Sequence, residues 1–284
     1  MKIVRLGNTE SHLLLSYYVI KYTYESDTIK MQFDRMFMSF ANWLYSSAGY
    51  YDKDVKGTPF NFDKTAITPK FLKYINELET AIGNCEETQF YFPPNIFAFL
   101  KKHEQHFLQV YKIKKFKLLN ETRFNDRVDQ IYDFMKHKKV LIVSSFDGLI
   151  QKQYDSGNVY KIYPKFPQLQ SLDTVKFPYC FCNDGPHQDY FETQDYIFDL
   201  IKEKDFDIAI LGCGSYGHML CHRIDNDLKK DAIYVGGNIQ EMFGILCERE
   251  KNAGFIKPNE FWITDIPKEY RPTNFKLVEN GCYW

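Results

Sequence analysis

The chain has 284 residues, a formal net charge of −1 and an aromatic content of 17%. Its length allows one large domain or two small ones, with a sizeable core in either case. A net charge so close to zero argues against the strong positive field of a general nucleic-acid-binding protein, so no nucleic-acid partner is expected.

Cysteine usage and hydropathy indicate the compartment. The seven cysteines are an odd number and cannot all pair with one another, and no hydrophobic signal segment precedes them. No apolar stretch reaches the roughly 18 residues that a membrane-spanning helix requires. We therefore expect a protein without a membrane span, with free thiols, in a reducing cytoplasm.

The first half of the chain combines one short strand with several helices. Residues 2–6 are predicted to form an apolar strand, and residues 7–10 a polar turn. A further turn is expected at residues 57–60. Apolar side chains at a helical period, with Thr or Pro at some of the starts, predict helices over residues 11–20, 28–48, 69–82, 94–111 and 127–136. The middle of the chain, from about 30 to 136, is therefore expected to be mostly helical.

The second half alternates strands with helices. Short apolar runs predict buried strands over residues 139–144, 206–211 and 232–235. Residues 191–202 are expected to form an amphipathic helix, and the proline-rich residues 155–188 mainly loop. This order predicts a parallel sheet with crossover helices. We expect one Rossmann-like α/β domain over residues 1–284, whose nucleotide-binding half spans about 137–284.

A glycine turn joins the second of these strands to its helix. Three glycines with G-x-G-x-x-G spacing let backbone N–H groups approach a ligand closely, because no Cβ stands in the way. The N-terminus of the following helix carries free N–H groups and a partial positive charge, which suit a phosphate. Six residues of this turn are candidate contacts for a diphosphate: Gly212, Gly214, Ser215, Tyr216, Gly217 and His218.

Other interpretations of this turn stay open. Three glycines can simply make a tight strand–helix turn, and similar turns serve enzymes that bind NAD or S-adenosylmethionine. A site for NAD needs an Asp or Glu after the next strand, and here that strand runs into Gly236-Gly237-Asn238. The sequence therefore favours a phosphorylated nucleotide other than NAD.

Polar residues also follow the strands at 139–144 and 232–235, at the ends where ligands bind in open α/β sheets. Ser144 and Ser145 can bond a phosphate or a ribose, although such serines more often cap helices. After the second of these strands, three residues are candidate contacts for the nucleotide or the sugar: Gly237, Asn238 and Gln240.

The loop after the first strand carries Arg5, Asn8 and Glu10. A carboxylate at a strand end is a candidate general base. The alternative is that Glu10 only stabilises the N-terminus of the next helix. His218 and His222 share one helix face, but no Glu accompanies them as in H-E-x-x-H, so no metal ligands are predicted.

Several segments, taken in order, carry a resemblance to a known family. Residues 3–10 read Ile-Val-Arg-Leu-Gly-Asn-Thr-Glu, which resembles an Arg-Phe-Gly-Asp-Gly-Glu segment of the GT-D type glycosyltransferases. Residues 47–51 read Ser-Ala-Gly-Tyr-Tyr, which resembles a downstream Asn-Ala-Gly-Tyr-Phe segment. Further segments resemble a set that recurs in related bacterial and giant-virus proteins: residues 140–146, 208–217, 236–244 and 259–262.

The resemblance implies transfer of a sugar from a nucleoside diphosphate donor to a hydroxyl of a glycan acceptor. It also implies that an Asp-x-Glu pair serves the active site, by metal binding or by base catalysis. Here Asn8 takes the place of the Asp, and an amide is a poorer ligand than a carboxylate for Mg²⁺ or Mn²⁺. Glu10 remains as the expected base, and Arg5 would orient it or the diphosphate.

The likeness to viral xylosyltransferases makes UDP-xylose the first donor to consider and fucose the first acceptor sugar. A direct displacement would invert the anomeric centre, and a viral chain would act in the host cytoplasm. Two alternatives are a Rossmann-type enzyme that uses a nucleotide or S-adenosylmethionine, and a non-catalytic protein that binds sugar nucleotides or glycans.

Overall fold

A computed structural model describes the chain except for residues 58–60, 62–65, 84, 119–124 and 255. The turn expected at residues 57–60 therefore lies mostly outside the described residues. No helix in the described part of the chain is both long enough and apolar enough to cross a bilayer.

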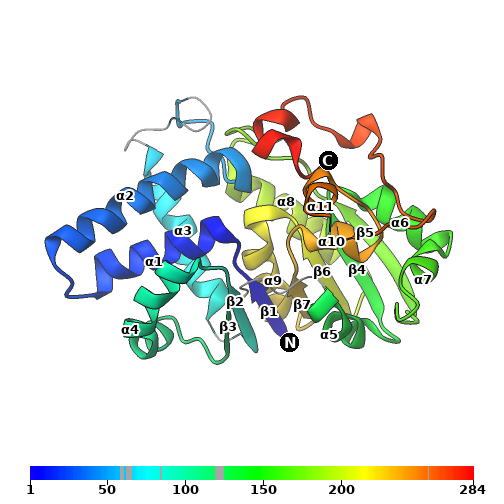
Figure 1. Ribbon diagram of the computed structural model, residues 1–284, viewed down its shortest axis with the longest axis horizontal. Helices are drawn as coiled ribbons and strands as arrows, with labels where there is room; N and C mark the ends of the chain where they lie inside the picture. Colours follow the sequence, from blue (N-terminus) through cyan, green and yellow to red (C-terminus); the bar gives the residue numbers. More distant parts are fainter. Residues whose placement is uncertain (58–60, 62–65, 84, 119–124, 255) are drawn as a thin grey trace.

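Seven parallel strands form one sheet at the centre of the molecule (Figure 1). Their order across the sheet is β3-β2-β1-β7-β6-β4-β5. Their bounds are β1 Lys2–Arg5, β2 Glu87–Phe90, β3 Phe116–Leu118, β4 Lys139–Ser144, β5 Ser171–Lys176, β6 Ile208–Gly212 and β7 Asp231–Tyr234. The predicted α/β class, with a parallel sheet and crossover helices, is confirmed.

Helices cover both faces of the sheet (Figure 1). Their bounds are α1 Asn8–Tyr22, α2 Asp27–Trp43, α3 Pro69–Ile82, α4 Pro94–Val110, α5 Asn125–Met135, α6 Asp147–Asp155, α7 Asn158–Ile162, α8 Tyr190–Lys202, α9 Gly217–Asp227, α10 Asn238–Met242 and α11 Glu248–Ala253. A π-helical turn, Leu44–Ala48, extends α2. Thr68 caps α3 as predicted, because its hydroxyl oxygen accepts a hydrogen bond from the Phe71 N–H at 3.1 Å.

The structure adds three strands that the sequence did not indicate. The middle region contributes β2 and β3, and the segment expected to be loop contributes β5 as well as α7. β2 reads Glu-Thr-Gln-Phe, so it lacks an apolar run, and its buried polar side chains are satisfied locally. Thr88 donates to the carbonyl of Ile82 at 3.1 Å, and the Gln89 amide donates to Glu87 at 2.6 Å. β3 has only three residues and β5 lies at an edge of the sheet.

Alternate residues of the central strands enter two separate cores. In β4, Leu141 and Val143 belong to the core that also contains residues of α1, α3, α8 and α9, whereas Val140 and Ile142 belong to the core that contains residues of α5, α6 and α10. Because both faces are covered, β4 is a continuous apolar run rather than an alternating one.

At two places in the sheet, neighbouring parallel strands are followed by helices on opposite faces. After β4 the chain passes to β5 through α6 and α7 on one face, and after β6 it passes to β7 through α9 on the other face. Similarly, α1 follows β1 on one face and α10 follows its neighbour β7 on the opposite face. Such switch points leave a crevice at the carboxyl ends of the strands, which is where α/β proteins bind ligands.

Candidate functional site

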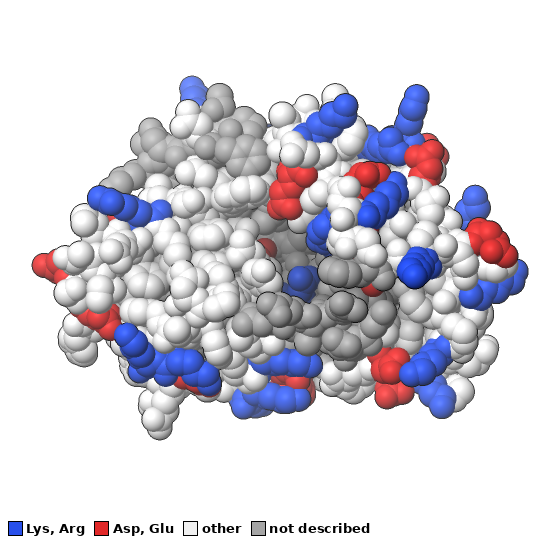
Figure 2. Space-filling model, viewed as in Figure 1, with Lys and Arg blue, Asp and Glu red and all other residues white. Residues whose placement is uncertain are grey.

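A cavity of about 580 Å³ lies at this carboxyl edge. Its walls come from the loops after β1, β2, β4, β5, β6 and β7, from the end of α2, from α11 and from the last residues of the chain. Figure 2 shows a hollow near the middle of one face of the molecule, with basic side chains in and around it. The size is that of a pocket for a nucleotide or a similar small molecule.

The cavity brings together residues that the sequence analysis singled out in four separate loops. The loops follow β1, β4, β6 and β7, so the topology and not the sequence distance makes these residues neighbours. The predicted residues that line it are Arg5, Glu10, Ser144, Ser145, Gly212, Gly214, Gly237 and Gln240, together with Asn8.

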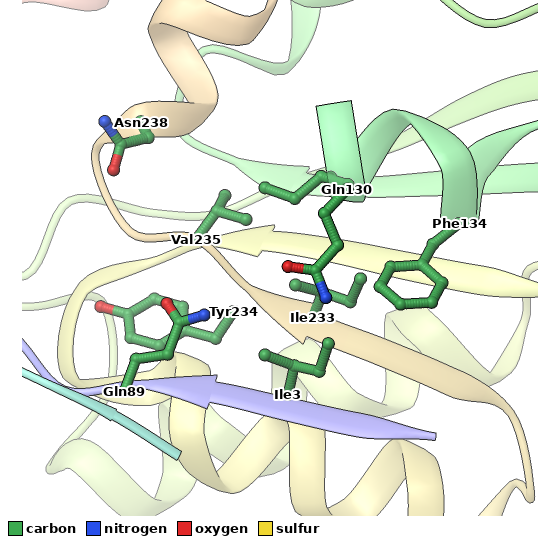
Figure 3. Close-up of a pocket in the computed structure, with 9 residues that line it drawn as sticks. Ile3, Gln89, Gln130, Phe134, Ile233, Tyr234, Val235 and Asn238 are labelled. Carbon is green, nitrogen blue, oxygen red and sulfur yellow. The ribbon is translucent and has the colours of Figure 1, made fainter. Parts of the chain in front are cut away.

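Five predicted contacts do not line this cavity. Asn238 borders a separate, small cavity of about 20 Å³ between α5, β1 and β7 (Figure 3), which has room for about one water molecule. In Figure 3, Gln130 and Phe134 of α5 cover Ile3 and Ile233 of the two strands. The other four residues belong to the second part of the glycine turn, which is buried and does not line the cavity: Ser215, Tyr216, Gly217 and His218.

The three glycines of the turn after β6 are explained by close packing against protein. A Cβ on Gly217 would overlap with the ring of Tyr234, and one on Gly212 would lie 2.9 Å from the carbonyl oxygen of Gly236. Gly214 has φ +54°, and its Cβ would lie 2.7 Å from the carbonyl oxygen of Ala48. The first turn of α9 is therefore buried, and the prediction that a diphosphate sits on this helix N-terminus is not supported by its position.

His218 is part of this buried packing. It is 1% exposed, its Nδ1 lies 3.0 Å from the carbonyl oxygen of Ser215, and its ring stands edge-on to Tyr234. Burial lowers the pKa of His218, with smaller opposing effects from the Glu10 charge and from the bond to Ser215. Burial therefore disfavours the charged form of this imidazole, which is the form that would attract a phosphate.

Glu10 lies in the first turn of α1, where the sequence predicted a turn before the helix. Gly7 precedes this helix without a side-chain cap, so the free N–H groups of the turn favour a negative charge there. Glu10 is 4% exposed and lines the cavity. Within the described residues, no hydrogen bond or ion pair joins its carboxylate to another side chain or to the backbone. Its carboxylate is therefore available to a ligand in the cavity.

Arg5 extends from the end of β1 toward the end of β7. One of its terminal nitrogens, Nη1, donates to the carbonyl of Val235 at 3.1 Å, and its buried Nε has no hydrogen-bond partner. No carboxylate of the described residues lies within ion-pair distance of its guanidinium. Arg5 therefore places an uncompensated positive charge on the cavity wall.

Ser144 bonds to the backbone before a helix, which is the more common of the two roles considered for it. It is 1% exposed, and its hydroxyl oxygen accepts a hydrogen bond from the backbone N–H of Phe146 at 3.2 Å. The hydroxyl therefore fixes the turn that leads into α6, while Ser145 beside it also lines the cavity.

The sequence analysis missed much of the cavity wall. Arg249 lines it and is paired with Glu250, with 2.7 Å between Nη2 and the carboxylate. Nine aromatic side chains complete the wall: Trp43, Tyr91, Phe146, Phe177, Tyr179, Phe181, Tyr234, Tyr283 and Trp284. They come from distant segments without a shared motif. The only signal in the sequence was the high aromatic content, which does not say which rings meet.

The cavity side chains beside Glu10 offer few ligands for a divalent metal. In the described ranges, no three His, Cys, Asp or Glu side chains gather as a possible metal site. Asn8 contributes an exposed amide to the cavity beside Glu10, and one carboxylate with one amide is a poor donor set for Mg²⁺ or Mn²⁺. No step of the chemistry below is therefore assigned to a metal.

No protein-family model, curated protein or solved structure matches the chain significantly. The resemblance to glycosyltransferases thus stays a prediction. Five of the segments that carry it nevertheless meet at this cavity: residues 3–10, 47–51, 140–146, 208–217 and 236–244 all contribute lining residues. Residues 259–262 do not.

Proposed function

We propose that the protein is a glycosyltransferase that moves a sugar from a nucleoside diphosphate donor to a hydroxyl of a glycan acceptor. The observation that carries this proposal is the Glu10 carboxylate, buried in the wall of a ligand-sized cavity and without a partner among the described residues. A buried and unpaired carboxylate costs stability, and it is the group that an incoming hydroxyl requires as a base.

The proposed step is a single displacement. The acceptor oxygen attacks the anomeric carbon, Glu10 takes the proton of that hydroxyl, and the bond from the anomeric carbon to the diphosphate oxygen breaks. The diphosphate leaves with the bonding electron pair, and positive side chains in the cavity stabilise the charge that develops on it. Attack from the side opposite the leaving group inverts the anomeric centre.

The remaining wall supports a nucleotide sugar as the ligand. Flat aromatic rings offer stacking surfaces for a nucleobase and for sugar rings, and convergent polar groups orient the ligand. The loop after β4 supplies the Ser145 hydroxyl, and α10 supplies Gln240, whose amide nitrogen donates to the Tyr283 carbonyl at 2.8 Å. We take UDP-xylose as the first donor and a fucose-bearing glycan as the first acceptor to test.

The test is the substitution Glu10→Gln, which keeps the size of the side chain and removes the base. We expect transfer from UDP-xylose to fall by about 100- to 10,000-fold, with no loss of affinity for UDP measured by calorimetry. Glu77→Gln is the matched control, because Glu77 on α3 is a half-buried carboxylate that lies outside the cavity and accepts from Gln194 at 3.4 Å. Full activity of the Glu10→Gln protein would remove the proposed base.

A further inference from the structure

We propose that the cavity holds a diphosphate at the turn between β7 and α10, between the side chains of Arg5 and Arg249. This location differs from the glycine turn after β6. The identity of the ligand as the diphosphate of a sugar donor rests on the proposed function, whereas the presence of a diphosphate site does not.

The two guanidinium groups flank two consecutive glycines. A Cβ on Gly236 would overlap with Nη1 of Arg5, and a Cβ on Gly237 would lie 3.3 Å from Nη2 of Arg249. The two arginines come from opposite ends of the chain, yet they meet at adjacent residues of one turn. Any larger side chain at either position would occupy the space beside a guanidinium.

These two side chains also account for the positive charge of the cavity. Among the described residues that line it, Arg5 and Arg249 are the only basic ones. No Lys or Arg side chain is among the atoms nearest to the glycines of the turn after β6, which belong to Ile239, the Ala48 carbonyl and the Tyr234 ring. The basic groups of the cavity therefore lie at the turn after β7 and not at the turn after β6.

Both guanidinium groups keep donors for a ligand. Arg5 has no ion pair in the described part of the chain, and its buried Nε lacks any hydrogen-bond partner. Arg249 binds a single oxygen of Glu250 through Nε and Nη2, at 2.8 and 2.7 Å. The ring of Tyr283 lies 5.3 Å from the Arg249 guanidinium and holds it against the turn. Planar guanidinium groups bind phosphate oxygens in pairs, which suits two linked phosphates.

A carboxylate from the C-terminal residues, that of Glu279, also belongs to the cavity wall. Glu279 lines the wall and accepts from Tyr283 at 3.5 Å and from the Cys282 thiol at 3.3 Å. These two contacts hold the Glu279 carboxylate against the C-terminal residues. Glu10 also lines the cavity, where it would take the proton of the acceptor hydroxyl in the proposed function.

The experiment measures binding of inorganic pyrophosphate, UDP and uridine by calorimetry, on the whole chain. We expect Arg249→Gln to weaken pyrophosphate and UDP by about tenfold or more, and to change uridine binding by less than about threefold. Arg5→Gln should act in the same direction, and Arg5→Lys should recover part of the loss because it restores the charge. Arg223→Gln is the matched control, since Arg223 is paired with Asp195 at 2.7 Å on α9 and lies outside the cavity.

The outcomes separate this proposal from the proposed function. Pyrophosphate that fails to bind, or binds equally to the wild type and to both Gln variants, would overturn the diphosphate site. If pyrophosphate and UDP bind through the arginines but no sugar is transferred from any nucleotide sugar, the site stands and the glycosyltransferase proposal fails. Thermal unfolding of each variant without ligand checks whether it folds. If Arg5→Gln does not fold, the result for Arg249→Gln alone tests the diphosphate site, because the Arg249 side chain is half-exposed.

Discussion

At the scale of single residues, close packing accounts for features that look like ligand contacts in the sequence. Gly217 follows the spacing of a phosphate-binding turn, yet its missing Cβ makes room for the ring of Tyr234. That ring belongs to β7 and contacts His218, so Gly217 joins the glycine turn to the neighbouring strand. A glycine pattern therefore predicts a close approach to the backbone, but it does not say whether a ligand or a protein side chain makes that approach.

The first prediction concerns this contact. Gly217→Ala should lower the free energy of unfolding by about 1–3 kcal/mol, because an added methyl overpacks a buried site. Urea denaturation followed by circular dichroism measures the change. Gly83→Ala is the matched control, since Gly83 has an ordinary φ of −67° and its Cβ would lie 3.4 Å from the nearest atom. Equal stability of the two variants would contradict the packing role of Gly217.

At the scale of elements, the last residues of the chain form part of the cavity wall. The Arg249 N–H donates to the carbonyl of Cys282 at 2.9 Å, and the Gln240 amide donates to the carbonyl of Tyr283 at 2.8 Å. Trp284 is 3% exposed, and its indole N–H donates to the hydroxyl of Tyr179 at 3.3 Å. Hydrogen bonds thus join this segment, shown in red beside α11 in Figure 1, to α10, to α11 and to the loop after β5.

The second prediction removes the buried ring of this segment. Trp284→Ala should lower the free energy of unfolding by about 3 kcal/mol or more, because it empties a buried aromatic site. Amide hydrogen exchange should become faster in residues 275–284 and stay slow in β4 and β6. Affinity for UDP should also fall, because Tyr283 loses its neighbour in the wall. Trp262→Ala is the control, as Trp262 is half-buried against Tyr163 and outside the cavity. Unchanged exchange in residues 275–284 would show that Trp284 does not anchor this segment.

At the scale of the whole molecule, the two halves of the chain form the two sides of one sheet, with β1–β3 on one side and β4–β7 on the other. β1 lies between β2 and β7, so the N-terminal strand becomes a neighbour of the last one. The cavity consequently takes Glu10 from one end of the chain and Tyr283 from the other. The carboxyl half, expected to be the nucleotide-binding half, supplies only part of the cavity wall.

The third prediction is a ligand effect on global stability. A nucleotide sugar at 100 times its dissociation constant should raise the free energy of unfolding by about 2.7 kcal/mol. A thermal-shift panel of UDP, UDP-xylose, NAD and S-adenosylmethionine, each with and without Mn²⁺, measures this. We expect stabilisation by UDP or UDP-xylose that does not depend on Mn²⁺. Stabilisation by S-adenosylmethionine or NAD alone would instead support the alternative Rossmann-type enzyme, and donor binding without transfer to any acceptor would support a non-catalytic binding protein.

The sequence by itself determined the elements whose causes are local. Apolar runs such as Lys139–Ser144, and caps such as Thr68 before Pro69, depend on neighbouring residues, so both appear in the structure as expected. The parallel α/β class also followed, because the order of strands and helices leaves few other arrangements. The polar strand Glu87–Phe90 could not be predicted from the sequence. It is a strand because it pairs with β1 and β3, and its composition does not indicate one.

Only the tertiary structure decided which residues share the site. Arg5, Glu10 and Gly237 were identified from loops at strand ends, but Arg249 and Tyr283 carry no local signal. The same structure buried His218 and the first turn of α9 behind the cavity. A motif records the shape of a few consecutive residues, whereas a cavity depends on which loops the strand order brings to one edge. For that reason the sequence predicted the type of fold and offered a candidate base, and the packing of distant segments located the charge that we assign to the diphosphate.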